Sequence, residues 1–350
     1  MFQKLLGTAK VNISTTRSII KTNEKLRKIA FEAGVITKHK EQECEELFNA
    51  LMQDIPKVTE WRVYDHCAVV TQLYAIYERF VEDLITDWLL ILPCLVPCYS
   101  ELEERIQNTH QKGVGRLLID LNKNRYKHLS NHKVIRGLFH GVNGEDQYEL
   151  LSDAFLFHEQ NLRKDILEKL LADAGISNTW IWVDKHKAVK NFVEEISGTQ
   201  DTAAGELSKL ISYRNDAAHG EPIDNFLGFD ALLELCDFVE SLCQALAELV
   251  TFQVIERKKT VGQVKVIGEL TEWFKKSKAG IAKINNIYSL SVGDTLYLVS
   301  EGSSCCQSAN IESIKIDDDS FDKVRTSSGM EIGLKFDIDA RKGLYLYILK

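Results

Sequence analysis

The hydrophobic pattern of the chain changes near residue 256, and this change limits the possible folds more than any other feature. Before this point apolar residues recur at three- and four-residue steps, which is typical of amphipathic helices. After it, short alternating runs are separated by glycine, serine and aspartate, which is typical of antiparallel strands. A chain of 350 residues is long enough for two domains. The sequence therefore predicts a multidomain α and β fold, with an all-α domain at 1–255 and a small antiparallel β-barrel at 256–350.

The spacing of apolar residues predicts several helices in the first part, at 13–54, 59–92, 146–175, 179–196, 202–220 and 226–255. The most apolar of the early helices is 59–92, and its expected buried stripe is Val69, Leu73, Ile76, Tyr77, Phe80 and Leu84. The charged run at 256–259 is expected to be a short linker between the domains.

The helix that ends near residue 220 carries an unusual combination of polar side chains at its end. Asp201 or Thr202 is a plausible N-cap, and Gly220 a stop signal. Arg214 and His219 lie roughly 140° apart around the helix axis, so they do not form a simple pair on one face. Asn215 and Asp216, which have poor helix propensity, stand between them. A sequence selected for folding alone gives little reason for this arrangement.

An arginine and a histidine close together suit the cleavage of RNA. Arginine stays charged at physiological pH and can bind a phosphate with two donors. Histidine titrates near neutral pH and can accept or donate a proton. Because RNA carries its own nucleophile, the 2′-hydroxyl, this chemistry requires no metal ion and no cofactor.

The segment from Arg214 to His219 resembles the Arg-x(4–6)-His motif of HEPN-domain ribonucleases, including the polar residue directly after the arginine. The stretch 74–82 resembles an earlier helix of the same family, in which an acidic residue, here Glu78, faces the motif. In pattern the resemblance covers residues 60–252. It implies an HEPN-like helical bundle with extra helices, a homodimer with a composite active site, and metal-independent endonucleolytic cleavage of RNA. A toxin or antiviral-defence role is implied as well.

The resemblance also assigns roles to individual residues. His219 would transfer protons, Arg214 would stabilise charge on the phosphate, and Asn215 and Asp216 would fix the geometry of the pair. Glu78 would orient Arg214 across the bundle. One alternative is a simple helix end, where His219 caps carbonyl groups and Arg214 pairs with a local acid. Another is a non-catalytic RNA-binding or dimeric adaptor protein, whose barrel docks a partner.

The segment 110–140 is strongly basic, although the chain as a whole has a net charge of −8. It contains seven lysines and arginines against one acid, Asp120, with histidines and aromatic residues between them. Such a stretch is a candidate phosphate-binding surface, or else a solvated connecting segment. The candidate RNA contacts are Arg125, Lys127, Lys133 and Arg136. The spacing of His128 and His132 would suit a metal ion on a helix face, but it fixes no third ligand, so no metal site is expected.

The second part of the chain reads as a series of short strands, with alternating runs at 264–266, 295–299, 311–316, 332–338 and 344–349. Turn signals separate these runs, among them Gly280 and Gly293. The order of glycines and hydrophobic residues resembles the second-domain barrel of translation elongation factors. No Gly-x4-Gly-Lys-Ser/Thr phosphate-binding loop accompanies it, so the barrel is expected to be an accessory domain. By analogy it would present tRNA or ribosome-associated RNA, or dock a protein.

Composition points to a cytoplasmic protein. No apolar run follows the first residues, so no signal peptide is expected, and the apolar run 88–99 is interrupted by prolines and too short to span a bilayer. The eight cysteines are scattered and show no Cys-x2-Cys pairing, which favours reduced thiols. The expected partners are RNA, a second copy of the chain and an antitoxin or regulatory protein, with no membrane.

Overall fold

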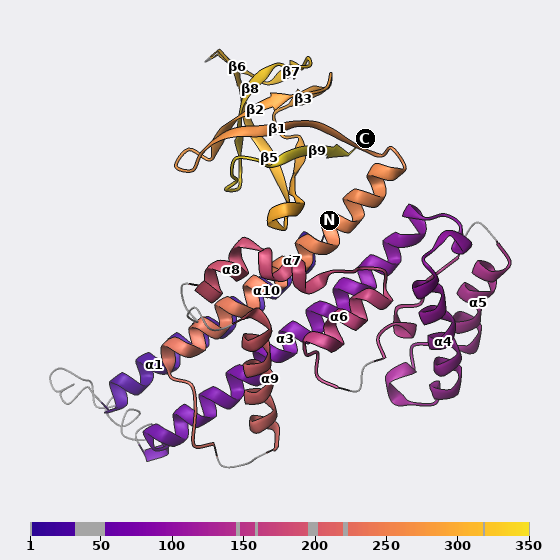
Figure 1. Cartoon of the computed structure of the whole chain (residues 1–350). Helices are drawn as coiled ribbons and strands as arrows, with labels where there is room; N and C mark the ends of the chain where they lie inside the picture. The colour runs from indigo at the N-terminus through magenta and orange to yellow at the C-terminus, as the bar shows by residue number, and fades with distance from the viewer. Residues whose placement is uncertain are drawn as a thin grey trace, which may run out of the picture.

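A computed structural model describes residues 2–31, 53–144, 148–157, 160–194, 202–219, 223–317 and 319–349. In these residues nine α-helices precede a β-barrel, so the predicted order of an all-α part and an antiparallel barrel is confirmed (Figure 1). The helices are α1 (Gln3–Phe31), α3 (Val58–Leu95), α4 (Glu104–Asp120), α5 (Asn131–Val142), α6 (Lys164–Asp173), α7 (Thr179–Lys185), α8 (Lys187–Phe192), α9 (Ala203–His219) and α10 (Phe229–Thr260). Short 3-10 turns lie at Tyr99–Glu101, Asn124–Tyr126, Ser152–Ala154 and Glu301–Ser303.

The long helices α1, α3 and α10 form the centre of the helical region. Each packs against the other two, and α9 crosses α3 (Figure 1). The predicted stripe of α3 is confirmed, because all six of its members are buried. Helix α10 is long and apolar enough by length and composition to cross a membrane, but 78% of its most apolar window is buried inside the protein. That burial is typical of the core helix of a packed domain.

Helix boundaries differ from the predictions at several points. Helix α1 begins at Gln3, ten residues before the predicted start at 13, and the second half of that prediction lies outside the described residues. The predicted helix 179–196 is divided into α7 and α8, which meet at His186 in an extended conformation. At the start of α9 the hydroxyl of Thr202 accepts a hydrogen bond from the amide of Gly205 at 3.1 Å, as expected of a capping residue. Asp201 lies outside the described residues.

The predicted helix at 146–175 is wrong over most of its length, since α6 starts only at Lys164. The described residues before it, 148–157 and 160–163, are irregular apart from one 3-10 turn, and they bury apolar side chains such as Phe155 against α4. Gly113 of α4 makes this contact possible, because a Cβ there would lie 2.0 Å from the carbonyl oxygen of Ala154. Close backbone packing replaces helical packing at this site.

The second part of the chain is a closed barrel of six antiparallel strands, in the order β4-β9-β1-β2-β8-β5 and back to β4. The strands of the ring are β1 (Val264–Phe274), β2 (Ala279–Ile284), β4 (Thr295–Ser300), β5 (Cys305–Ile316), β8 (Glu331–Phe336) and β9 (Tyr345–Leu349). Strand β6 (Asp319–Phe321) pairs antiparallel with the end of β5, and β3 (Ser289–Ser291) pairs with β7 (Lys323–Arg325). Closure leaves few unpaired edges, and the interior is filled by its own apolar cluster.

Two sequence-based expectations for this part are wrong. Gly280 was expected to mark a turn, but it lies in β2, where a Cβ would come within 2.3 Å of the Glu272 carbonyl oxygen of β1. The charged run 256–259 was expected to be a linker, but it forms the last turn of α10. Basic side chains at a helix C-terminus are favourable, and Lys259 also pairs with Glu256 at 3.3 Å.

The end of α10 lies beside the barrel and packs against β5 and β1 (Figure 1). The apolar cluster of the helices continues into five barrel side chains, Val264, Tyr297, Val299, Cys306 and Tyr347. The exact domain boundary stays a prediction, but the two parts are joined by a packed junction.

Candidate active site at the end of helix α9

The Arg214–His219 segment forms the end of α9, and two different environments meet there. Upstream, Leu207, Leu210 and Ile211 are buried against the rest of the helical region, and α9 packs on α3. Arg214 follows Leu210 by four residues, so it continues this face and is half-buried. His219 is the last residue of the helix and is exposed. The guanidinium is therefore held in a packed setting, whereas the imidazole is open to a ligand or a second protein.

Two neighbours fix the position of the Arg214 side chain. Its Nη1 donates a hydrogen bond to Oδ1 of Asn215 at 3.2 Å. Its guanidinium carbon lies 5.0 Å from the centre of the Tyr74 ring, which is a cation–π contact. A guanidinium has five N–H donors, so these contacts leave donors for a phosphate.

Tyr74 connects Arg214 to Glu78. The Tyr74 hydroxyl donates to Oε1 of Glu78 at 3.0 Å and accepts from the amide of Leu162, also at 3.0 Å. Burial raises the pKa of Tyr74 to about 12, so the hydroxyl remains a donor at neutral pH. Among the described residues Glu78 thus acts on Arg214 through Tyr74, and not through an ion pair of its own.

Asn161 is a member of the site that the sequence analysis missed. Its Nδ2 donates to Oδ1 of Asn215 at 2.8 Å, the same oxygen that accepts from Arg214. The next residue, Leu162, is bonded on both sides, since its carbonyl accepts from the Tyr77 hydroxyl at 3.0 Å and its amide donates to Tyr74. Asn161 precedes α6 in an irregular segment, so no periodicity marks it. The clamp is visible only once α3, α9 and this segment are assembled.

Asp216 faces a different neighbour, the buried His66 of α3. Burial lowers the pKa of His66, and the negative charge of Asp216 opposes that shift. Nδ1 of His66 accepts from the amide of Leu227 at 3.1 Å, and its ring meets the Tyr213 ring edge-on at 5.3 Å. His66 therefore contacts both Tyr213 within α9 and Leu227 ahead of α10.

A comparison with known protein families matches residues 37–251 to the RiboL-PSP-HEPN family. The match covers more than half of the chain and includes α3, α9 and the motif between Arg214 and His219. The chain belongs to the RiboL-PSP-HEPN family. No curated protein and no solved structure gives a significant match. HEPN domains are often ribonucleases or nucleotide-binding domains, which sets the general class of activity.

The predicted RNA contacts lie in another part of the HEPN domain. Arg125, Lys127, Lys133 and Arg136 are all exposed, on the 3-10 turn Asn124–Tyr126, just after it, and on α5. Helix α6 contacts both α4 and α9 and lies between the basic segment and the motif (Figure 1). The basic side chains are thus available to a ligand but do not line the Arg214 site.

His128 and His132 do not share a helix face, so the arrangement that their spacing would suit is not formed. Helix α5 begins at Asn131, and His128 lies before it, with Nε2 3.2 Å from Oδ2 of Asp153. In the part of the chain that the structure describes, no three histidine, cysteine or acidic side chains gather in a metal-binding arrangement.

Proposed function

We propose that this protein is a metal-independent endoribonuclease in which Arg214 and His219 act on the scissile phosphodiester. The observation that carries the proposal is the setting of this pair in an HEPN domain. Arg214 is oriented by Asn215 and Tyr74 with donors to spare, and His219 is exposed at the adjoining helix end. Asp216, on the last turns of α9, lies within electrostatic reach of His66.

The chemistry follows from these groups. A histidine base removes the proton of the 2′-hydroxyl, and the 2′-oxygen attacks the phosphorus. The bond from phosphorus to the 5′-oxygen breaks, and a histidine acid protonates that oxygen. The products are a 2′,3′-cyclic phosphate and a 5′-hydroxyl. Arg214 stabilises the charge that builds on the phosphoryl oxygens, while Asn161 and Glu78 hold its neighbours in place.

A second copy of the chain would complete the site. In-line cleavage uses a base and an acid, and each chain offers one exposed histidine in the motif. A two-fold dimer that brings two α9 ends together supplies both histidines and both arginines. Such an enzyme needs restraint in the cytoplasm, which fits a toxin or antiviral-defence effector controlled by an antitoxin or regulatory partner.

The basic segment would bind RNA away from the cleaved bond. Arg125, Lys127, Lys133 and Arg136 are exposed. Each contact from a cation to a phosphate adds affinity and makes the binding more sensitive to salt. Replacing them should weaken RNA binding across all sequences and reduce the salt dependence, with little change in the rate of the bound complex. The barrel would then present tRNA or ribosome-associated RNA, or dock a protein.

The deciding experiment incubates end-labelled RNA with purified protein in EDTA. His219→Ala should reduce the cleavage rate by about 10²–10⁴-fold, and Arg214→Ala by about 10²–10³-fold. Two matched controls, Ser212→Ala on the exposed face of α9 and Arg79→Ala, an exposed arginine of α3, should cleave like the wild type. A substrate with a single 2′-deoxy position should resist cleavage at that position.

The competing function is a non-catalytic RNA-binding or dimeric adaptor protein. HEPN domains are ribonucleases or nucleotide-binding domains as a general class, so membership is compatible with binding alone. Equal fragment patterns from the wild type, His219→Ala and Arg214→Ala would end the nuclease proposal. A gel shift that survives both substitutions without any cleavage would favour the adaptor.

A further inference from the structure

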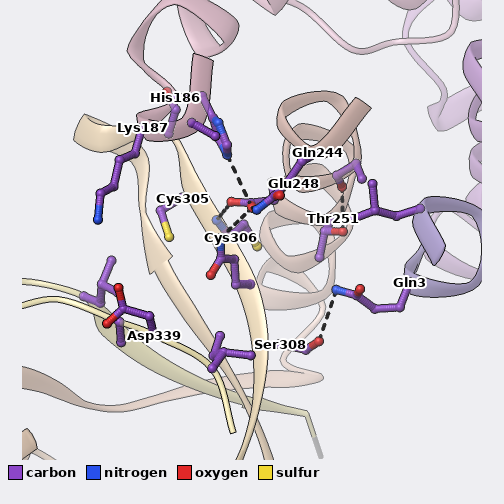
Figure 2. A pocket seen from close by; sticks show the side chains of 18 of the residues that line it. Gln3, His186, Lys187, Gln244, Glu248, Thr251, Cys305, Cys306, Ser308 and Asp339 are labelled. Atoms are coloured by element: carbon purple, nitrogen blue, oxygen red, sulfur yellow. Dashed lines mark hydrogen bonds and ion pairs between the residues drawn. The ribbon is translucent and has the colours of Figure 1, made fainter. Parts of the chain in front are cut away.

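A cavity of about 470 Å³ lies at the junction of the helices and the barrel, away from the Arg214 motif. Its walls come from the start of α1, from α8 and α10, and from the segments of the barrel around Cys305 and Arg341 (Figure 2). Cavities of about 300–1,000 Å³ between domains are the usual size and place of small-molecule sites. None of its lining residues belongs to α9, so the cavity is separate from the proposed nuclease site.

The inner wall of this cavity is built around one buried carboxylate. Glu248 of α10 is 5% exposed and accepts from four donors. These are Gln307 Nε2 at 2.6 Å, Gln244 Nε2 at 3.0 Å, the Cys306 amide at 3.1 Å and His186 Nε2 at 3.3 Å. Figure 2 shows this group at the centre of the cavity wall. Burial alone would raise the pKa of Glu248, but these donors, led by His186, keep it below its usual value. The carboxylate in this wall is therefore charged, and its hydrogen-bonding capacity is used within the protein.

Two cations face the cavity without a carboxylate of their own. Arg341 of the barrel donates from Nη2 to the carbonyl and the hydroxyl of Ser303, both neutral groups. Lys187, at the start of α8, is exposed and forms no ion pair with any acid in the described ranges. Burial raises the pKa of the Cys305 thiol to about 12, and the charges of Arg341 and Lys187 both act against that rise. Both cations therefore lie within electrostatic reach of the Cys305 thiol, Lys187 from the helical region and Arg341 from the barrel.

The other charged groups of the lining are already engaged. Lys10 contacts Gln244 at 3.3 Å and Glu240 at 3.8 Å, and the Asp339 carboxylate accepts from the Trp273 indole at 2.9 Å. The His186 ring is a different case, because it is 3% exposed and its Nδ1 has no hydrogen-bond partner among the described residues. A buried nitrogen without a partner is unfavourable, so a ligand group beside it would be stabilising.

We propose that the junction cavity binds a small polyanion, a molecule with phosphate or clustered carboxylate groups, between Lys187 of the helical region and Arg341 of the barrel. The Arg341 guanidinium has five N–H donors, of which the described contacts to Ser303 and the Cys305 thiol use only part, and lysine supplies a mobile point charge. Together they suit a multivalent oxyanion. Such a ligand stabilises the closed junction because it contacts both parts at once. The proposal is independent of the nuclease chemistry.

Thermal unfolding of the full chain tests this site, with pyrophosphate and citrate as probes at constant ionic strength. At a probe concentration ten times its Kd, mass action predicts that Tm rises by about 2 °C for a chain of this length. Lys187→Ala, Arg341→Ala and Lys187→Glu should abolish that rise. The matched controls Lys190→Ala and Lys342→Ala remove the same charge from exposed neighbours outside the lining and should keep it.

Titration calorimetry on the same variants gives a second readout that does not depend on unfolding. Lys187 is exposed and makes no described hydrogen bond, so its variants keep the proposal testable even if Arg341→Ala folds poorly. Binding of pyrophosphate alone assigns a phosphate ligand, and binding of citrate as well assigns any clustered oxyanion. No binding of either probe, or equal binding to the cavity and control variants, would overturn the proposal.

Discussion

The end of α9 and the junction at Glu248 place charged groups in opposite ways. At the end of α9, Arg214 has one hydrogen bond and one ring contact, and His219 is exposed. At the junction, the Glu248 carboxylate is buried and receives four donors. Sparse contacts leave bonding capacity for a substrate, whereas saturated contacts spend it within the fold. The comparison separates side chains that are proposed to contribute to chemistry from side chains that contribute to stability.

The largest expected effect is a loss of folding stability at the Glu248 junction. Glu248→Ala leaves four donors, among them the imidazole of His186, without their acceptor, and removal of one member of a buried pair typically lowers stability by about 3–5 kcal/mol. Urea unfolding should show this loss, whereas the cleavage rate per folded molecule should stay close to the wild type.

A matched control on the same helix is Glu256→Ala. Its carboxylate forms an exposed ion pair with Lys259, so the expected loss is below about 1 kcal/mol. Similar losses from the two substitutions would contradict the special position of Glu248.

The next effect is a pH dependence of stability that comes from His110 of α4. Burial lowers the pKa of His110 to about 4, while the unfolded chain titrates near the ordinary value of 6.5. Between these values the unfolded state binds more protons, so stability is full above pH 6.5 and falls as the pH drops towards 4. For one such group the loss between pH 7.5 and pH 5 is about 2 kcal/mol.

Urea unfolding at pH 7.5 and pH 5 measures this loss, and His110→Gln should remove most of it. His128→Gln serves as the control, because His128 is exposed and should leave the slope unchanged. An identical slope in the wild type and His110→Gln would rule out this assignment. The buried His66, whose pKa burial also lowers, adds to the slope in both proteins.

The smallest expected effect concerns the proposed active site at the end of α9. Asn161→Ala removes one hydrogen bond to Asn215 and so lets Arg214 move, which should lower kcat by about tenfold, the equivalent of a single net hydrogen bond. KM and the free energy of unfolding should change little.

A double-mutant cycle identifies how Asn161 acts. If it works through Asn215, then Asn161→Ala should add almost nothing to Asn215→Ala, whereas Asn215→Asp, which keeps an acceptor for both donors, should retain most activity. Additive losses would show that Asn161 acts by another route.

The sequence predicted the fold well where local pattern and burial coincide. The stripe of α3 and the alternation of the barrel strands follow directly from which residues must face a core. Prediction failed where the backbone itself makes the contact. Gly113 and Gly280 carry no side chain, so nothing in the pattern shows that a neighbouring carbonyl fills their space. For Gly280 the pattern predicted a turn, and only the assembled structure gives the reason for either glycine.

The candidate site divides in the same way. Arg214 and His219 stand out because their chemistry and spacing are local. Asn161 and Tyr74 reach the site from other elements. The sequence around Asn161 shows no periodic pattern, and a buried tyrosine in an apolar helix, such as Tyr74, is usually a core residue. The sequence alone indicates the groups that are proposed to react, whereas the assembled fold is needed to identify the groups that orient them.

The shared apolar cluster at the base of the barrel has a practical consequence for anyone who wishes to cut the protein. A fragment that stops at residue 255 would lose the last turn of α10 and would remove the barrel members of this cluster, such as Tyr347 and Val299, so its helical side would be exposed. Such a fragment should aggregate and be poorly soluble. A usable isolated catalytic half would require new polar residues on that surface, designed in place of the missing barrel.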